Sequence, residues 1–325
     1  MNVDLANKKI LFFGIGFYDY EDAIKHELQN MGASVTYYLD KTLWQRSSVI
    51  TKISRWLHID VLKLADAYHS EILNKIDDDS YDYVFVLKGD GLTESFLSEL
   101  RKRLTNAPFI MYQWDSLARV PNAVRFFQYF DKIFSFDRID CLNDKRLNFR
   151  PLFFRESNEK INYSKKYDMA FIGWLNAERL PIIERVNQWS KSNKLKSFFY
   201  LSTGLKTYLI NVIKNKSEFI YFRKISYKRV CEISSITNVI LDFPHPQQSG
   251  LTMRTIEAVG MKKKLITTNR DILNYDFFNK NNILIINDGL DGLSKSFFDF
   301  PCVDISEMII EKYKLSSWVH EVFSI

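Results

Sequence analysis

Short apolar runs alternate with helix-patterned stretches along almost the whole chain. The first run covers residues 9–13 and stops at Gly14, and a stretch with helical spacing follows over residues 21–31. Short apolar runs bounded by glycine are typical of buried strands, and strands that alternate with helices build parallel sheets covered by helices. The sequence therefore predicts an α/β fold.

This alternation occurs in two successive series. The expected strands are residues 9–13, 34–38, 83–87, 109–112 and 132–136 in the first series, and 168–172, 196–201, 239–242, 265–268 and 283–286 in the second. The segment 150–166 between them is polar and charged, as linkers are. We expect two Rossmann-like doubly wound domains with an interdomain cleft, residues 1–158 and 159–304, and a C-terminal helix, 305–325, that can pack back on the first.

Composition narrows the class of protein. A net charge of +6 without a long basic run argues against nucleic-acid binding. Cys141, Cys231 and Cys302 are far apart, which is typical of reduced thiols in the cytoplasm. No apolar run reaches the roughly 18 residues that a membrane span needs. We expect a cytoplasmic protein, either in solution or at the inner face of the cell membrane, where the basic and apolar stretch 41–63 could make contact. A helix packed on its own domain would explain that stretch equally simply.

The segment from Asp242 to Gly260 carries the strongest functional signal. A strand ends at Asp242, a loop with two prolines follows, and Ser249, Gly250 and Thr252 then open a helix over residues 249–259. Ser249 can cap that helix, Gly250 lets a ligand approach the backbone, and free amide hydrogens at a helix start attract anions. Arg254 adds a cation one turn later, which suits a phosphate.

Two further side chains of this segment fit the same site. Glu257 lies three residues after Arg254 and could accept hydrogen bonds from a ribose. His245, between the two prolines, could donate to a leaving phosphate. The simpler alternatives are a helix cap, a surface Arg–Glu pair and a loop histidine. Because all these groups follow the carboxyl end of one strand, we favour the binding site.

Four stretches also carry a resemblance to a known family. They are ILFFGIGFYDYE, MYQWDS with IFSFD, YDMAFIGW, and LDFPHPQQSGLTMRTIEAVGMKKKLITTN. Together they resemble GT-B glycosyltransferases, specifically the CgeB-like branch that includes enzymes of lipopolysaccharide and capsule synthesis. The resemblance implies a nucleotide-sugar donor as substrate, no metal or other cofactor, and transfer to a lipid-linked or oligosaccharide acceptor of a surface polysaccharide, such as lipopolysaccharide, O-antigen or capsule.

The resemblance also implies places for the donor. The C-terminal domain would hold it, with Gly173 nearby, Glu257 on the ribose, and Ser249, Gly250 and Thr252 on the pyrophosphate. Retaining enzymes of this kind often carry two glutamates, and only Glu257 matches. Asp242 or His245 stands in the other place, so retaining and inverting chemistry both stay open.

In the first series, Asp115 is a candidate general base. It follows a strand end, and an inverting transfer needs a base within hydrogen-bond reach of the acceptor hydroxyl. A turn-forming aspartate is an equally good interpretation, and Asp19 is the competing base. The glycines at 14 and 16 lack the third glycine of a dinucleotide fingerprint. A nicotinamide-dependent epimerase or oxidoreductase, or a non-catalytic partner in polysaccharide assembly, is the alternative function. Histidines and cysteines show no metal-binding spacing.

Overall fold

The computed structural model describes residues 4–16, 19–41, 61–156, 165–214 and 217–324. The chain forms two compact units. Unit 1 comprises Met1–Pro151, Gln247–Gly250 and Leu315–Ile325, and unit 2 comprises Leu152–Pro246 and Leu251–Lys314. The expected domain boundary at 158/159 falls in the segment 157–164, which lies outside the described residues.

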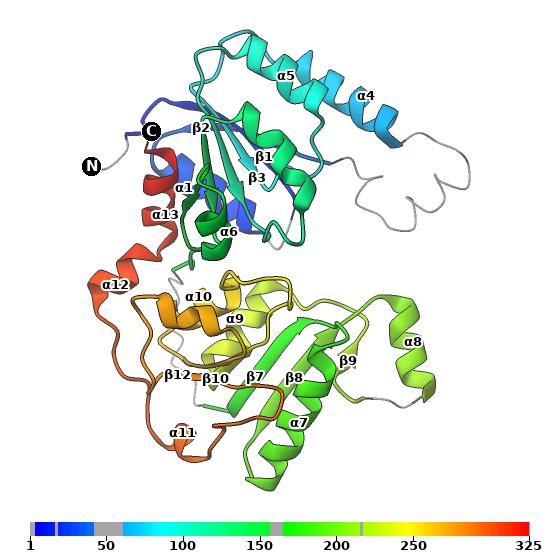
Figure 1. The fold of residues 1–325 in the computed structure, drawn as a ribbon, viewed down its shortest axis with the longest axis vertical. Helices are drawn as coiled ribbons and strands as arrows, with labels where there is room; N and C mark the ends of the chain where they lie inside the picture. The colour runs from blue at the N-terminus through cyan, green and yellow to red at the C-terminus, as the bar shows by residue number, and fades with distance from the viewer. Residues whose placement is uncertain (1–3, 17–18, 42–60, 157–164, 215–216, 325) are drawn as a thin grey trace. The chain divides into compact units, whose positions relative to one another are not determined.

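Unit 1 is built on a parallel sheet with the strand order β2-β1-β3-β4-β5-β6 (Figure 1). Its strands are β1 (Lys9–Gly14), β2 (Ser34–Leu39), β3 (Tyr83–Leu87), β4 (Phe109–Gln113), β5 (Lys132–Ser135) and β6 (Leu147–Phe149). Its helices are α1 (Tyr20–Asn30), α4 (Val61–Leu73), α5 (Glu94–Arg103), η1 (Pro121–Tyr129), α6 (Arg138–Asn143) and α13 (Leu315–Phe323).

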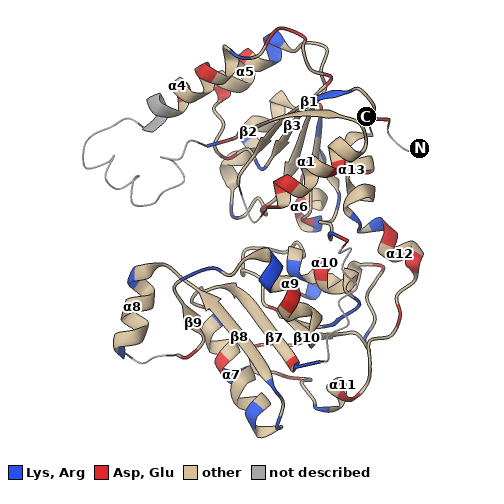
Figure 2. Ribbon diagram, turned by 180° about the vertical axis from the view of Figure 1, so that it is seen from behind, with Lys and Arg blue, Asp and Glu red and all other residues tan. Residues whose placement is uncertain are grey.

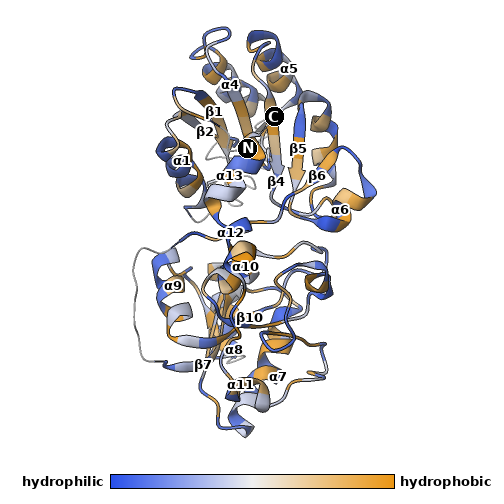
Figure 3. Cartoon of the chain, turned by 90° about the vertical axis from the view of Figure 1, so that its left-hand side faces the viewer, coloured by the Kyte–Doolittle hydropathy of each residue, from blue (hydrophilic) through white to orange (hydrophobic). Residues whose placement is uncertain are grey.

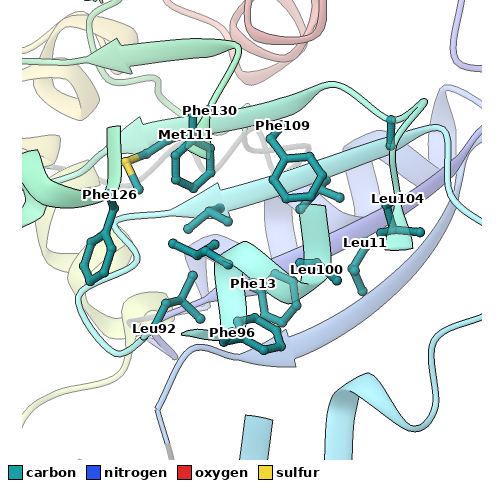
Figure 4. Packing of buried hydrophobic residues seen from close by; sticks show 14 of the residues in the cluster. Leu11, Phe13, Leu92, Phe96, Leu100, Leu104, Phe109, Met111, Phe126 and Phe130 are labelled. Atoms are coloured by element: carbon teal, nitrogen blue, oxygen red, sulfur yellow. The ribbon is translucent and has the colours of Figure 1, made fainter. Parts of the chain in front are cut away.

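Both faces of this sheet are apolar, because successive side chains of a strand point to opposite sides. Leu11 and Phe13 of β1 belong to the core that α5 and η1 cover, together with Phe96 (Figure 4). Phe12, between them, packs on Phe85 of β3 on the other face. The near-continuous apolar runs of the sequence are explained by this two-sided burial.

Helix α13 covers the second face. In Figure 1 this red helix lies beside the blue α1, although the two are almost 300 residues apart in the chain. Trp318 is fully buried, with its ring 4.7 Å from that of Tyr112 and 6.0 Å from that of Phe85. Lys132 Nζ also donates to the Ser324 carbonyl at 2.6 Å. The C-terminal helix therefore belongs to the core of unit 1.

The single helix expected over residues 305–325 is wrong in one respect. The structure has α12 (Glu307–Lys312) in unit 2 and α13 in unit 1, with a break at Tyr313 and Lys314. The Tyr313 hydroxyl donates to Asp276 at 2.7 Å, and Lys314 forms a β-bridge with Phe154. Because these contacts hold the intervening residues on unit 2, the helix cannot continue unbroken.

Unit 2 is a second parallel sheet, with the order β12-β11-β10-β7-β8-β9. Its strands are β7 (Tyr167–Trp174), β8 (Ser197–Ser202), β9 (Ile220–Tyr221), β10 (Thr237–Asp242), β11 (Lys264–Thr267) and β12 (Ile283–Ile285). Its helices are α7 (Arg179–Ser192), α8 (Leu205–Lys214), α9 (Tyr227–Ser235), α10 (Met253–Gly260), η2 (Arg270–Asn274), α11 (Ser296–Asp299) and α12.

Helices cover both faces of this sheet as well. Phe171 of β7 packs in the cluster that contains Ile183 of α7, whereas Ile172 packs in the cluster that contains Ile233 of α9. Figure 3 shows orange, hydrophobic residues along the strands and helices, alternating with blue ones on the helices. The predicted α/β class with two doubly wound sheets is confirmed.

Candidate functional site

The strand order of unit 2 contains a topological switch point. From β7 the chain proceeds through β8 to β9 on one side, and from β10 it proceeds through β11 to β12 on the other. Strands β7 and β10 are neighbours, so the connections that follow them leave in opposite directions. In open parallel sheets ligands bind at the carboxyl ends of these two strands.

Arg179 lies at this switch point. Its Nε donates to the carbonyl of Phe243, directly after β10, at 2.6 Å, and its Nη1 donates to the carbonyl of Trp174, the last residue of β7, at 2.8 Å. Arg179 is also the first residue of α7, and its backbone N–H donates to Asn176 Oδ1 at 2.7 Å. The guanidinium and the positive end of the helix dipole therefore coincide at the carboxyl ends of β7 and β10.

An aromatic ring and a second cation lie at the same edge of the sheet. Trp174 is 46 % exposed, and Lys224 Nζ lies 5.2 Å from the centroid of its ring. Gly173 precedes Trp174, and a Cβ at that position would lie 2.9 Å from the ring of Phe171. The residues around Gly173, which the sequence places near the donor, therefore include groups that suit a nucleotide. The Trp174 ring offers a π face, and Lys224 offers positive charge.

The start of α10 is fixed to the end of β10. Thr252 is the N-cap, accepting from the Thr255 N–H at 3.3 Å. Its hydroxyl donates to Asp242 Oδ2 at 2.6 Å, and the Thr255 hydroxyl donates to the same oxygen at 2.7 Å. Because Asp242 is only 6 % exposed, these two hydroxyls stabilise a carboxylate that has little contact with water. Helices α7 and α10 therefore both begin beside the switch point.

The predicted start of this helix was wrong by four residues, and the reason is a distant carboxylate. Ser249 does not cap α10; its hydroxyl donates to Asp137 Oδ1 at 2.6 Å, and the Gly250 N–H donates to Asp137 Oδ2 at 2.9 Å. A Cβ at Gly250 would overlap the ring of Phe136, so packing explains this glycine. Donors expected to hold pyrophosphate are thus engaged by an acidic side chain of unit 1.

Glu257 lies on α10 in a buried cluster. Its side chain is 6 % exposed, and the guanidinium carbon of Arg155 lies 3.6 Å from the ring centroid of Tyr227. Burial, followed by the negative charge of Glu257, raises the pKa of Tyr227 well above its usual range. A carboxylate beside a neutral phenol and an arginine can accept hydroxyl donors. Arg254, three residues earlier, is half-buried. The ribose role of Glu257 stays a prediction.

The proposed acid and base residues occupy different environments. His245 is half-buried in the loop after β10. Asp19 is exposed, has a left-handed backbone with φ 58°, and precedes α1. Asp115 lies after β4, where its Oδ2 is 2.7 Å from Lys88 Nζ and its Oδ1 is 2.6 Å from Arg119 Nη1. Each oxygen of this carboxylate is therefore paired with a cation.

Residues 88–91, which follow β3, belong to a charge cluster of unit 1. Lys88 contacts Asp90 at 3.3 Å as well as Asp115, and Lys41 contacts Asp90 at 2.7 Å. Asp40 adjoins them, and its Oδ2 accepts from the Gly91 N–H at 3.1 Å. These residues follow β2, β3 and β4, around the switch point between β1 and β3. Their positions after strand ends were the only sequence signal.

Metal binding and membrane spanning each have clear structural requirements, and the described part of the chain meets neither. Within it, no group of three or more His, Cys, Asp or Glu side chains is arranged to hold a metal ion. No helix among those residues combines the length and the apolar character that crossing a bilayer demands. Most of the basic stretch 41–63 lies outside the described residues.

Comparisons with known proteins define the fold. No protein-family profile and no curated protein sequence matches the chain. Among solved structures, AviGT4, a glycosyltransferase involved in avilamycin A biosynthesis, superposes with a TM-score of 0.56 at 9% identity, over 97% of this chain and 95% of that one. UDP-GlcNAc 2-epimerase from Neisseria meningitidis, bound to UDP-GlcNAc, gives 0.54 at 10% identity, over 97% of both chains.

A third structure, S. aureus MnaA with UDP, gives a TM-score of 0.53 at 12% identity, over 98% of this chain and 93% of that one. Identities this low establish the fold alone. The chain has the GT-B architecture of two Rossmann-like domains, as predicted. The expected interdomain cleft and the CgeB-like branch stay predictions.

Proposed function

We propose that this protein is a nucleotide-sugar-dependent glycosyltransferase that needs no metal and extends a surface polysaccharide such as lipopolysaccharide, O-antigen or capsule. The observation that carries the proposal is the position of Arg179, which joins the carboxyl ends of β7 and β10 at the start of α7. A helix start with a fixed guanidinium at a switch point is a binding place for a diphosphate.

The chemistry follows from charge. When the bond between sugar and diphosphate breaks, negative charge grows on the leaving nucleotide. Arg179, whose guanidinium is held in place by two carbonyls, would put a fixed positive charge beside the phosphate oxygens, and Lys224 and Arg254 would add positive charge. The exposed ring of Trp174 would stack on the nucleobase. These groups would supply the electrostatic stabilisation that a divalent ion supplies in other transferases.

The remaining residues would complete the transfer. Thr252 holds the start of α10 and, with Glu257 on the ribose, would orient the donor. His245 would protonate the leaving phosphate, and Asp115 or Asp19 of unit 1 would receive the proton of the acceptor hydroxyl. The assignment of a lipid-linked or oligosaccharide acceptor rests on the sequence resemblance.

Binding measurements with UDP, GDP, dTDP and CMP, and with their sugars, test the donor site. One nucleotide should raise the melting temperature, because a ligand that binds only the folded state stabilises it. Arg179→Ala should weaken that nucleotide by about 10- to 150-fold, the range for a hydrogen bond to a charged group. Arg185→Ala is the matched control, since Arg185 lies on the same helix and contacts only Asp288, at 3.9 Å, among its described ion partners. Equal nucleotide affinity of the two variants would refute the site.

A second candidate is a nucleotide-sugar epimerase, since one of the superposed structures is a UDP-GlcNAc 2-epimerase. The two functions differ in their need for an acceptor. We would incubate the protein with the nucleotide sugar that binds best, with and without nicotinamide cofactor and with no acceptor, and follow the sugar by NMR. A new sugar epimer formed without an acceptor favours the epimerase.

A further inference from the structure

Helix α8 of unit 2 presents its apolar side outward. Four of its large side chains lie on one helical face: Leu205 is 51 % exposed, Leu209 48 %, Val212 55 % and Ile213 82 %. Ile210, beside them, is 39 % exposed. We call these five residues the α8 face. Single exposed apolar residues are ordinary, but five on one short helix mark an interaction surface.

The opposite side of α8 fixes this orientation. Asn211, the polar residue of the helix interior, is buried, donates to the Ser217 carbonyl at 2.9 Å and accepts from the Ser217 N–H at 3.0 Å. Tyr208 packs on the unit 2 core, with its ring 6.2 Å from that of Phe222. Asn211 and Tyr208 therefore hold the helix in this orientation. Turning the α8 face toward the core of unit 2 would break the contacts of both residues.

Lysines flank the α8 face along the helix. Lys206 and Lys214 lie near the two ends of α8, and Figure 2 shows the colour of Lys and Arg at both ends of this helix. From residue 203 to residue 229 the sequence has seven Lys or Arg and a single acidic residue, Glu218. Apolar side chains flanked by lysines fit a surface with an apolar interior and anionic groups at its boundary with water.

We propose that α8 docks the protein on an anionic lipid bilayer, lying in the plane of the headgroups. A second copy of this chain fits less well, because a stable protein interface takes about 20–30 residues a side. A two-fold contact would also bring the same lysines toward one another. In an anionic bilayer, the acyl chains would bury the α8 face and the headgroups would pair with the lysines. This proposal does not depend on the donor site.

Vesicle flotation of the full-length protein tests the proposal. We expect the protein to float with vesicles of phosphatidylcholine containing about one-third phosphatidylglycerol, and to bind phosphatidylcholine alone at least about tenfold more weakly. The double variant Leu209→Gln, Ile213→Gln should lose at least about tenfold in binding to the anionic vesicles. Both side chains are exposed, so the fold should tolerate the change.

Two further variants separate the causes. Met308→Gln changes an apolar residue of α12 that is 75 % exposed, and it should bind vesicles as the unchanged protein does. Lys206→Glu with Lys214→Glu keeps the apolar face and should abolish the preference for anionic vesicles. Equal flotation of the α8 variants and the unchanged protein would overturn the proposal. So would a dimer in light scattering that the glutamine variant abolishes, with no vesicle binding. Unchanged nucleotide affinity in these variants keeps this test independent of the proposed function.

Discussion

Asp40 should make the stability of the protein fall as the pH rises. This residue follows β2, is 1 % exposed, and has one oxygen, Oδ1, with no hydrogen-bond partner in the part of the chain that the structure describes. Burial, followed by the negative charge of Asp90, raises the pKa of the Asp40 carboxyl from 3.8 to about 7. The folded protein therefore resists ionisation of this group.

The magnitude follows from proton linkage. Below about pH 4 the carboxyl is protonated in both the folded and the unfolded state, so its ionisation does not change the free energy of unfolding. As the pH rises toward 7, the unfolded chain loses this proton while the folded chain keeps it, and the free energy of unfolding decreases. The interval between 3.8 and about 7 corresponds to about 4 kcal/mol, since each pKa unit is worth about 1.4 kcal/mol.

The variant Asp40→Asn removes the ionisation and keeps an oxygen that can accept from Gly91. Its free energy of unfolding should equal that of the unchanged protein at about pH 4 and exceed it by up to about 4 kcal/mol at about pH 8. Urea unfolding followed by circular dichroism at several pH values measures this difference. A difference that is the same at every pH would refute the reasoning.

Asp82→Asn is a control with the opposite sign. The Lys9 N–H donates to this carboxylate at 2.8 Å, and that bond, with Lys8, lowers the pKa of Asp82. The unchanged carboxylate stabilises the fold above its unfolded pKa of about 4, so this variant should be less stable than the unchanged protein there, and the deficit should shrink as the pH falls through the lowered pKa of Asp82. If the stability of both variants changed with pH in the same direction, the cause would be the solution conditions and not the two carboxyl groups.

Three further substitutions test the packing and the cap. Gly260→Ala should destabilise unit 2 by about 1–3 kcal/mol, because the new Cβ would overlap the Phe154 ring; Gly204→Ala, where nothing lies within 4 Å of a Cβ, should be neutral in the same urea titration. Trp318→Ala should cost about 3–5 kcal/mol in urea unfolding, since the side chain is fully buried; a loss below about 1 kcal/mol would show that α13 is dispensable. Thr252→Ala should cost about 1 kcal/mol in thermal unfolding through the lost cap, and a neutral result would contradict its capping role.

The fold could be predicted from the sequence because its signals are local. Most strands are short apolar runs that end at a glycine or a polar residue, as Tyr83–Leu87 does before Lys88. Strands β6 and β9 were not predicted, because they have only three and two residues. The start of α10 was mistaken because Ser249 and Thr252 are both good caps. The choice between them depends on Asp137, which lies 112 residues from Ser249 in the chain.

The candidate site was predicted only in part for the same reason. Asp242 and Thr252 were found because they lie in one continuous segment. Arg179 was not predicted, because the carbonyl of Phe243 that it contacts is 64 residues away. Every residue has a backbone carbonyl, so the sequence does not indicate which one accepts. The outward orientation of the α8 face could not be predicted, because outward-facing apolar residues have the same spacing as inward-facing ones.

The return of α13 to unit 1 has a consequence for how a cell makes this protein. All the residues of unit 2 leave the ribosome before Leu315 does. Until then the sheet face that carries Phe85 and Tyr112 has no helix α13 to cover it. The nascent chain can complete unit 2 while unit 1 still exposes an apolar sheet face. Chaperones bind apolar surfaces of this kind. The first unit to be translated is the last to be finished.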